Sequence, residues 1–232
     1  MSDDEIKITE IPPALHNLMW SDFPEDYQHD YTVRLLRDAH NNAEAAWKRT
    51  LLAHRAAMAD VTQTPDNNLQ RSHRAAEKFK KQAESVMQPA MEHALKELDR
   101  LDAEMDRVPR MPSDTSVRLT ADLLNAMSPE DRHKRVTEAI DNGEAQTVAA
   151  VLFFGDPWHF GLSQTKRDLF KAVYRQKMYP ELVARRAAIV EAADRTFEGR
   201  KAYDRVYTKL IDVKRLDAAQ ALAEAAKKAL GE

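Results

Sequence analysis

The residues best suited to chemistry lie in the turn from Gly155 to Gly161. This turn contains Asp156, Trp158 and His159, and it follows the most apolar segment of the chain. A carboxylate and an imidazole can transfer protons to and from a substrate held between them, but a turn that packs aromatic rings over a helical core needs the same residue types. We favour the structural turn, with partner binding through Trp158 and His159 as the second interpretation and catalysis as the third.

Three other groups combine histidine with carboxylates at spacings that would suit a metal ion. They are His40 with Glu44, His93 with Glu97, and Asp26 with His29 and Asp30. A closed metal site needs three or four ligands, and no H-E-x-x-H motif accompanies these groups. We therefore interpret them as polar surface and expect no metal.

The composition of the chain excludes several classes of enzyme. Its 232 residues include five glycines and no cysteine, and they contain neither a G-x-G-x-x-G nor a G-x-x-x-x-G-K-[ST] motif. A nucleotide cradle, a thiolate metal centre and a cysteine nucleophile are therefore absent, and no serine nucleophile elbow is present. We expect no catalytic residue and no cofactor.

Basic residues gather between 164 and 186, where seven of them outnumber two acids and alternate with tyrosines. The residues from this region that we predict to bind a partner are Lys166, Arg167, Lys171, Arg175, Arg185 and Arg186. A cationic face with aromatic rings suits nucleic acid. The favoured alternative is a solvated helix face whose charges meet acids elsewhere in the chain, because the net charge is only −3.

Residues 1–30 predict an acidic, extended arm. They hold eight acids against one lysine, and Pro12, Pro13 and Pro24 oppose a continuous helix. Apolar side chains such as Trp20 and Phe23 are unusual in a solvated tail. We therefore expect these two residues to dock on this chain or on another subunit.

Residues 31–108 predict a long antiparallel helical hairpin with coiled-coil character. Between 36 and 57, small residues recur every three or four positions, beside a bulkier ridge from Trp47 to Val61. A second apolar stripe runs from 69 to 108 and changes register at Pro89, where we expect a kink or local unwinding. The turn after Thr64 separates the two helices.

Residues 109–232 predict a C-terminal helical domain of shorter elements. Ser128 and Ser163 are expected N-caps, and Asn142-Gly143 is an expected helix end. The segment 144–154 is the best candidate for a buried helix, with a β-strand at its end as the alternative, for which no partner strand is visible. A last helix should open at Pro180 and run nearly to the end, with Gly199 as its one break, into an alanine-rich tail.

The segment 138–181 resembles a segment of uncharacterised phage and prophage proteins. The resemblance rests on Asn142-Gly143-Glu144, Ala149-Ala150-Val151-Leu152, Pro157, Gly161-Leu162-Ser163 and Pro180-Glu181, about a fifth of the chain. The loop departs from the usual pattern at Trp158 and His159. The resemblance implies a viral genome context and no assigned activity, so it transfers no functional residue.

These observations predict an all-α protein, a hairpin followed by a C-terminal bundle, that is not an enzyme. We expect a phage structural or assembly protein that forms homo-oligomers or binds other phage proteins, in the bacterial cytoplasm or in a virion. The alternative is a regulator that binds or mimics nucleic acid through the basic 164–186 face. The acidic N-terminus and the lack of a long apolar run predict no signal peptide and no membrane partner.

Overall fold

The computed structural model describes residues 11–108 and 111–211, together with 215–218, 221–222, 225 and 228. Throughout this part the chain is all-helical and has no strand, as expected. The first ten residues, with four of the eight acids of the predicted arm, lie outside the described residues. So does most of the alanine-rich tail.

The described residues form two compact units. Unit 1 comprises 11–97 together with the described residues from 188 onward, and unit 2 comprises 98–187 without 109–110. The chain therefore enters unit 2 from α2 and returns to unit 1 along α7. The division into an arm, a hairpin and a C-terminal domain is a different description of the chain and stays a prediction.

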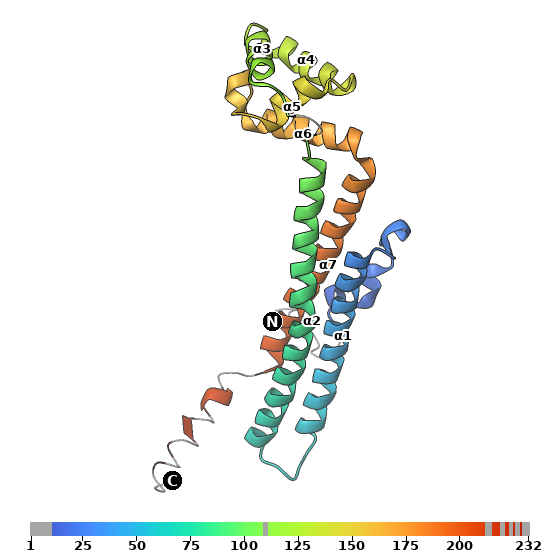
Figure 1. Cartoon of the computed structure of the whole chain (residues 1–232). Coiled ribbons are helices and arrows are strands. Elements are labelled where there is room, and N and C mark those ends of the chain that lie inside the picture. Colours follow the sequence, from blue (N-terminus) through green and yellow to red (C-terminus); the bar gives the residue numbers. More distant parts are fainter. Residues whose placement is uncertain are drawn as a thin grey trace, which may run out of the picture. The chain divides into compact units, whose positions relative to one another are not determined.

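Unit 1 is built from three long helices, α1 (Tyr31–Met58), α2 (Pro65–Met105) and α7 (Pro180–Leu210), of which it holds α1 and most of α2 and α7. α1 and α2 pack antiparallel, and the unit 1 part of α7 runs beside them (Figure 1). Asp30 caps α1 by accepting hydrogen bonds from the amides of Thr32 and Val33. The small-residue seam of α1 is buried, as expected, from Leu36 to Thr50.

Three expectations for these helices differ from the structure. The bulky ridge of α1 does not continue to the end of the seam, because Met58 is exposed and Val61, beyond the helix, is 95% exposed. Gly199 does not break α7, which is helical on both sides of it and ends at Leu210. Pro89 lies inside α2, which stays helical through it, so local unwinding is absent and the kink stays a prediction.

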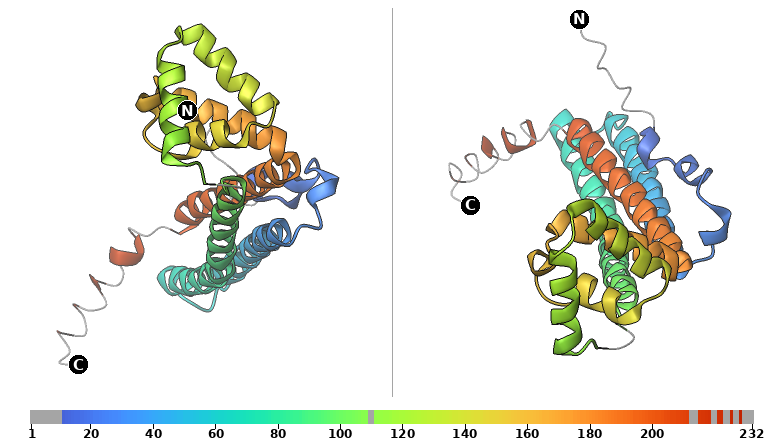
Figure 2. Two further views of the ribbon diagram at one scale, coloured as in Figure 1. Left: turned by 45° about the horizontal axis from the view of Figure 1, so that its top comes forward. Right: turned by 90° about the horizontal axis from the view of Figure 1, so that it is seen from above.

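The N-terminal segment 11–30 is not extended, contrary to expectation. It forms three 3-10 turns: η1 (Pro13–Leu15), η2 (Asn17–Trp20) and η3 (Glu25–Tyr27). Prolines exclude a long helix here but fit the first positions of such turns. η1 and η2 pack on α1 (Figure 2).

Unit 2 contains the ends of α2 and α7 together with four shorter helices and one 3-10 turn. These are α3 (Asp114–Asn125), α4 (Pro129–Asp141), α5 (Ala145–Phe153), η4 (Pro157–Phe160) and α6 (Gln164–Met178). Ser128 and Ser163 cap α4 and α6 as predicted. α5 is the expected buried helix, with Val148 to Leu152 inside the core.

Candidate functional site

The loop between Gly155 and Gly161 is held on three sides by hydrogen bonds to its backbone. Arg167 donates to the carbonyl of Gly155 at 2.7 Å, Arg132 donates to the carbonyl of Gly161, and Asn125 donates to the carbonyl of His159 at 2.7 Å. Phe160 is fully buried and anchors the loop in the unit 2 core. The conformation of this loop is therefore fixed by groups from α3, α4 and α6.

Trp158 is exposed, although the favoured interpretation was a turn that packs this ring over the helical core. Its side chain is 67% exposed, and its ring lies against the exposed His159 imidazole, with 3.9 Å between the ring centroids. The amide of His159 donates to the carbonyl of Asp156, which closes the 3-10 turn. The loop thus presents a paired indole and imidazole on a rigid base, an arrangement suited to contact with another surface.

The two arginines that hold the loop also close helix ends. Arg132 donates to the carbonyls of Leu124 and Met127 at the end of α3, at 2.7 and 3.1 Å. Arg167 donates to the Leu152 carbonyl near the end of α5 at 2.8 Å. Carbonyls at a helix C-terminus lack helical donors, so a guanidinium satisfies them well.

Arg167 has this internal role instead of a free position on the basic face. It is almost completely buried, and burial lowers its pKa, with Asp168 and Asp156 opposing the shift. The sequence predicts a surface position for Arg167, because a helical register alone does not show a hydrogen bond to a carbonyl fifteen residues earlier.

The other basic residues of 164–186 largely contact acids of unit 2. Arg175 binds Asp102 at 3.1 Å and Asp106 at 2.7 Å, and Arg186 binds Asp102 at 3.0 Å. Lys171 lies 3.7 Å from Asp106, and Lys177 binds Asp141 at 2.7 Å. Lys166 is exposed, and Arg185 is half-buried. The acids that meet these basic residues are Asp102 of α2, Asp106 just beyond its end, and Asp141 of α4.

Trp20 and Phe23, the remaining predicted partner-binding residues, are buried in their own chain. Their side chains are 6% and 3% exposed, and their rings pack together with centroids 5.4 Å apart. Trp20 also meets His40 of α1 edge-on at 5.8 Å, and the guanidinium of Arg195 lies over Phe23. The described part of the arm therefore docks in cis.

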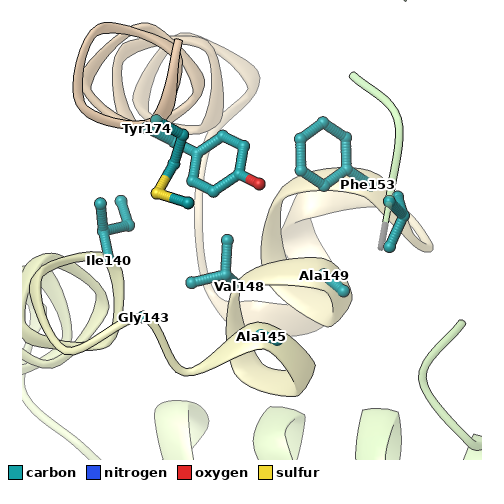
Figure 3. A pocket seen from close by; sticks show the side chains of 9 residues that line it. Ile140, Gly143, Ala145, Val148, Ala149, Phe153 and Tyr174 are labelled. Atoms are coloured by element: carbon teal, nitrogen blue, oxygen red, sulfur yellow. The ribbon is translucent and has the colours of Figure 1, made fainter. Parts of the chain in front are cut away.

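An apolar cavity of about 60 Å³ lies in unit 2 between α4, α5 and α6. Figure 3 shows Ile140, Val148 and Tyr174 converging on it from these helices. Burial raises the pKa of Tyr174 to about 12, with Tyr179 adding to the shift. Its lining offers apolar contact and a neutral hydroxyl.

None of the metal-like spacings forms a site in the described residues, which contain no group of three or more potential ligands. Asp30 caps α1, and His93 lies edge-on to Tyr31. His40 and Glu44 are both buried beneath the N-terminal segment. The prediction of polar surface for His40 and Glu44 was therefore wrong, although a glycine in the middle of α7 was a signal that another side chain approaches closely.

Comparison with known proteins adds no relative. No protein-family model, curated protein or solved structure matches the chain. Among the described residues, no helix is both long and apolar enough to span a bilayer.

Proposed function

We propose that the protein is a non-enzymatic assembly component that works by association, with Trp158 as the central contact. The observation that carries the proposal is an indole exposed on a loop whose backbone is tied to three helices. Tryptophan often dominates the binding energy of an interface. A fixed loop also loses little conformational freedom on binding.

The proposal names a second copy of this chain as the first partner to test. Sedimentation velocity from low to high micromolar concentration should show reversible self-association. Trp158→Ala should weaken it by about 30-fold or more, equivalent to about 2 kcal/mol. Leu52→Ala, at an exposed site on α1, is the matched control and should leave association unchanged. A wild-type chain that stays monomeric at every concentration contradicts the proposal.

The viral setting rests on the resemblance of segment 138–181 to phage proteins. Capsid, portal or terminase genes beside the gene for this chain would support assembly of a virion. Replication or defence genes in that position would instead favour the regulator.

We do not extend the proposal to nucleic acid. Four basic residues of the 164–186 region contact aspartates, so much of its charge is neutralised within unit 2. A chain that lacks residues 1–30 provides the test. Tight, steeply salt-dependent binding of DNA or RNA by that chain would instead support a regulator that binds nucleic acid through the basic 164–186 face.

A further inference from the structure

Residues 11–30, which we call the strap, cover a buried histidine on α1. Leu15, Trp20 and Phe23 of the strap are buried in unit 1. From α7, Arg195 donates to the carbonyl of Met19 and to the carboxylate of Asp22, the latter at 2.8 Å. The strap is thus docked by apolar burial, by Arg195 and by a hydrogen bond from the Asn17 amide to Glu44 of α1.

His40 lies under the strap without solvent contact. Its side chain is 0% exposed, and neither ring nitrogen has a well-aligned hydrogen-bond partner among the described residues, although backbone groups of His16, Leu15 and Arg195 lie near the ring. The ring lies against Gly199 of α7, where an added Cβ would stand 2.7 Å from Nδ1 and 3.3 Å from the carbonyl oxygen of Ala14. A neutral imidazole tolerates such a site, whereas a buried cation without a partner is costly.

Each element packed on His40 carries charged or titratable groups, of which Glu44 acts on the ring through its charge. On α1, the Glu44 carboxylate lies one turn away, but it already accepts from the Asn17 amide at 3.1 Å and pairs with Lys48 at 2.9 Å. From α7, Arg195 pairs with Glu191. From the strap come Asp22, which pairs with Arg195, and His16, whose Nδ1 accepts from the Leu18 amide.

The balance of these groups favours the neutral ring. Burial lowers the pKa of His40, while backbone groups of His16, the charge of Glu44 and backbone groups of Leu15 and Arg195 oppose the shift. When the strap leaves, water reaches the ring and the pKa returns towards its ordinary value of 6.5. The open state therefore binds the proton more tightly than the closed state.

We propose that the strap is an acid-operated clasp, which neutral His40 holds closed and protonated His40 opens. Opening exposes Leu15, Trp20 and Phe23 together with the face of α1 and α7 beneath them. The proposal does not depend on Trp158 and goes beyond the association proposed above.

Proton linkage sets the direction and the size of the effect. Because the pKa of His40 is lower in the closed state, closure is fully favoured above pH 6.5 and weakens as the pH falls below it. One proton changes the ratio of open to closed chains by at most tenfold per pH unit.

The chain has no cysteine, so two labels can report on the strap directly. Ser21→Cys on the strap and Glu198→Cys on α7 are both at exposed positions. Energy transfer between dyes at these sites should fall between pH 8 and pH 5, while far-UV circular dichroism stays constant. Unchanged transfer over that range would overturn the proposal.

Substitutions test whether the pH-dependent change in energy transfer comes from the His40 imidazole. His40→Phe should make the transfer independent of pH, and His40→Gln serves if the phenyl ring is not accommodated. His16→Gln is the matched control and should keep the transition. A transition that survives both His40 substitutions, or disappears in His16→Gln, contradicts the proposal.

Titration of the His40 ring in the unsubstituted chain tests the proposal without those variants. The His40 ring resonance, assigned through its contact with the Trp20 indole, should titrate below pH 6.5. Deletion of residues 1–30 should move that titration up towards 6.5. If the His40 ring already titrates at pH 6.5 in the intact chain, the strap does not respond to protonation of His40, and the proposal is wrong.

Discussion

Gly199 stands in the middle of α7 because His40 occupies the space in which a side chain would lie. In an unobstructed helix, alanine is more stable than glycine by about 1 kcal/mol. Here the added Cβ would be 2.7 Å from Nδ1 of His40, so we expect Gly199→Ala to destabilise the protein by about 1–3 kcal/mol.

Urea denaturation measures the change in unfolding free energy caused by Gly199→Ala. A loss of stability would show that the added Cβ is obstructed. His40→Ala removes the obstructing ring, so in that background Gly199→Ala should cost clearly less or even stabilise. Equal costs in both backgrounds would mean that His40 is not the obstacle.

Arg167 and Lys166 are neighbours on α6 with opposite surroundings. Arg167→Met leaves the carbonyls of Leu152 and Gly155 without their guanidinium donor, which should cost about 1–3 kcal/mol of unfolding free energy. Lys166→Met, at an exposed site, should change it by less than about 0.5 kcal/mol. Thermal denaturation of the two variants side by side decides the comparison, and equal stabilities would refute the structural role of Arg167.

At the scale of the element, Pro89 interrupts the hydrogen bonding of α2. It is exposed, it has no amide hydrogen to donate to the carbonyl of Ser85, and the helix nevertheless continues through it. Pro89→Ala should therefore raise the unfolding free energy by about 1–3 kcal/mol, and Pro89→Gly by about 1 kcal/mol less.

Chemical denaturation of both variants tests that order. A loss of stability in Pro89→Ala would show that the proline ring contributes contacts to the groove beside Tyr31 and Val86 that outweigh the missing bond.

Helix boundaries could be predicted from the sequence because their causes are local. Ser128 and Ser163 cap the amides three residues ahead, and Pro180 opens α7, all within one helical turn. The alanine seam of α1 could be predicted equally well, since the spacing of its small residues shows which face of the helix is buried. The fold class followed from these signals.

The candidate site was less predictable because its geometry depends on contacts between distant residues. Arg167 resembles any surface arginine until the carbonyls of Leu152 and Gly155 reach it. His40 resembles a polar surface histidine until residues 11–30 and α7 cover it. Trp158 was expected to pack over the helical core with the other rings of its turn, but it is exposed and only Phe160 is buried, a difference that the residue types of the turn do not show.

At the scale of the whole molecule, unit 2 is a continuous stretch of chain with its own core. Leu124, Ile140, Leu152 and Phe170 are buried within it. We expect a fragment of residues 98–187 to fold alone and to melt cooperatively when followed by circular dichroism. Leu124→Ala should lower its stability by about 2–5 kcal/mol. A fragment without a cooperative transition would show that the unit depends on the rest of the chain.

The path of the chain also imposes an order on synthesis. His40 meets Gly199 only after 159 further residues have been made, and all of unit 2 lies between them. On the ribosome, unit 2 can therefore fold while the first two helices still wait for α7. During that interval their alanine seam has no third helix to cover it, which makes the nascent chain a natural client for chaperones that bind exposed apolar segments.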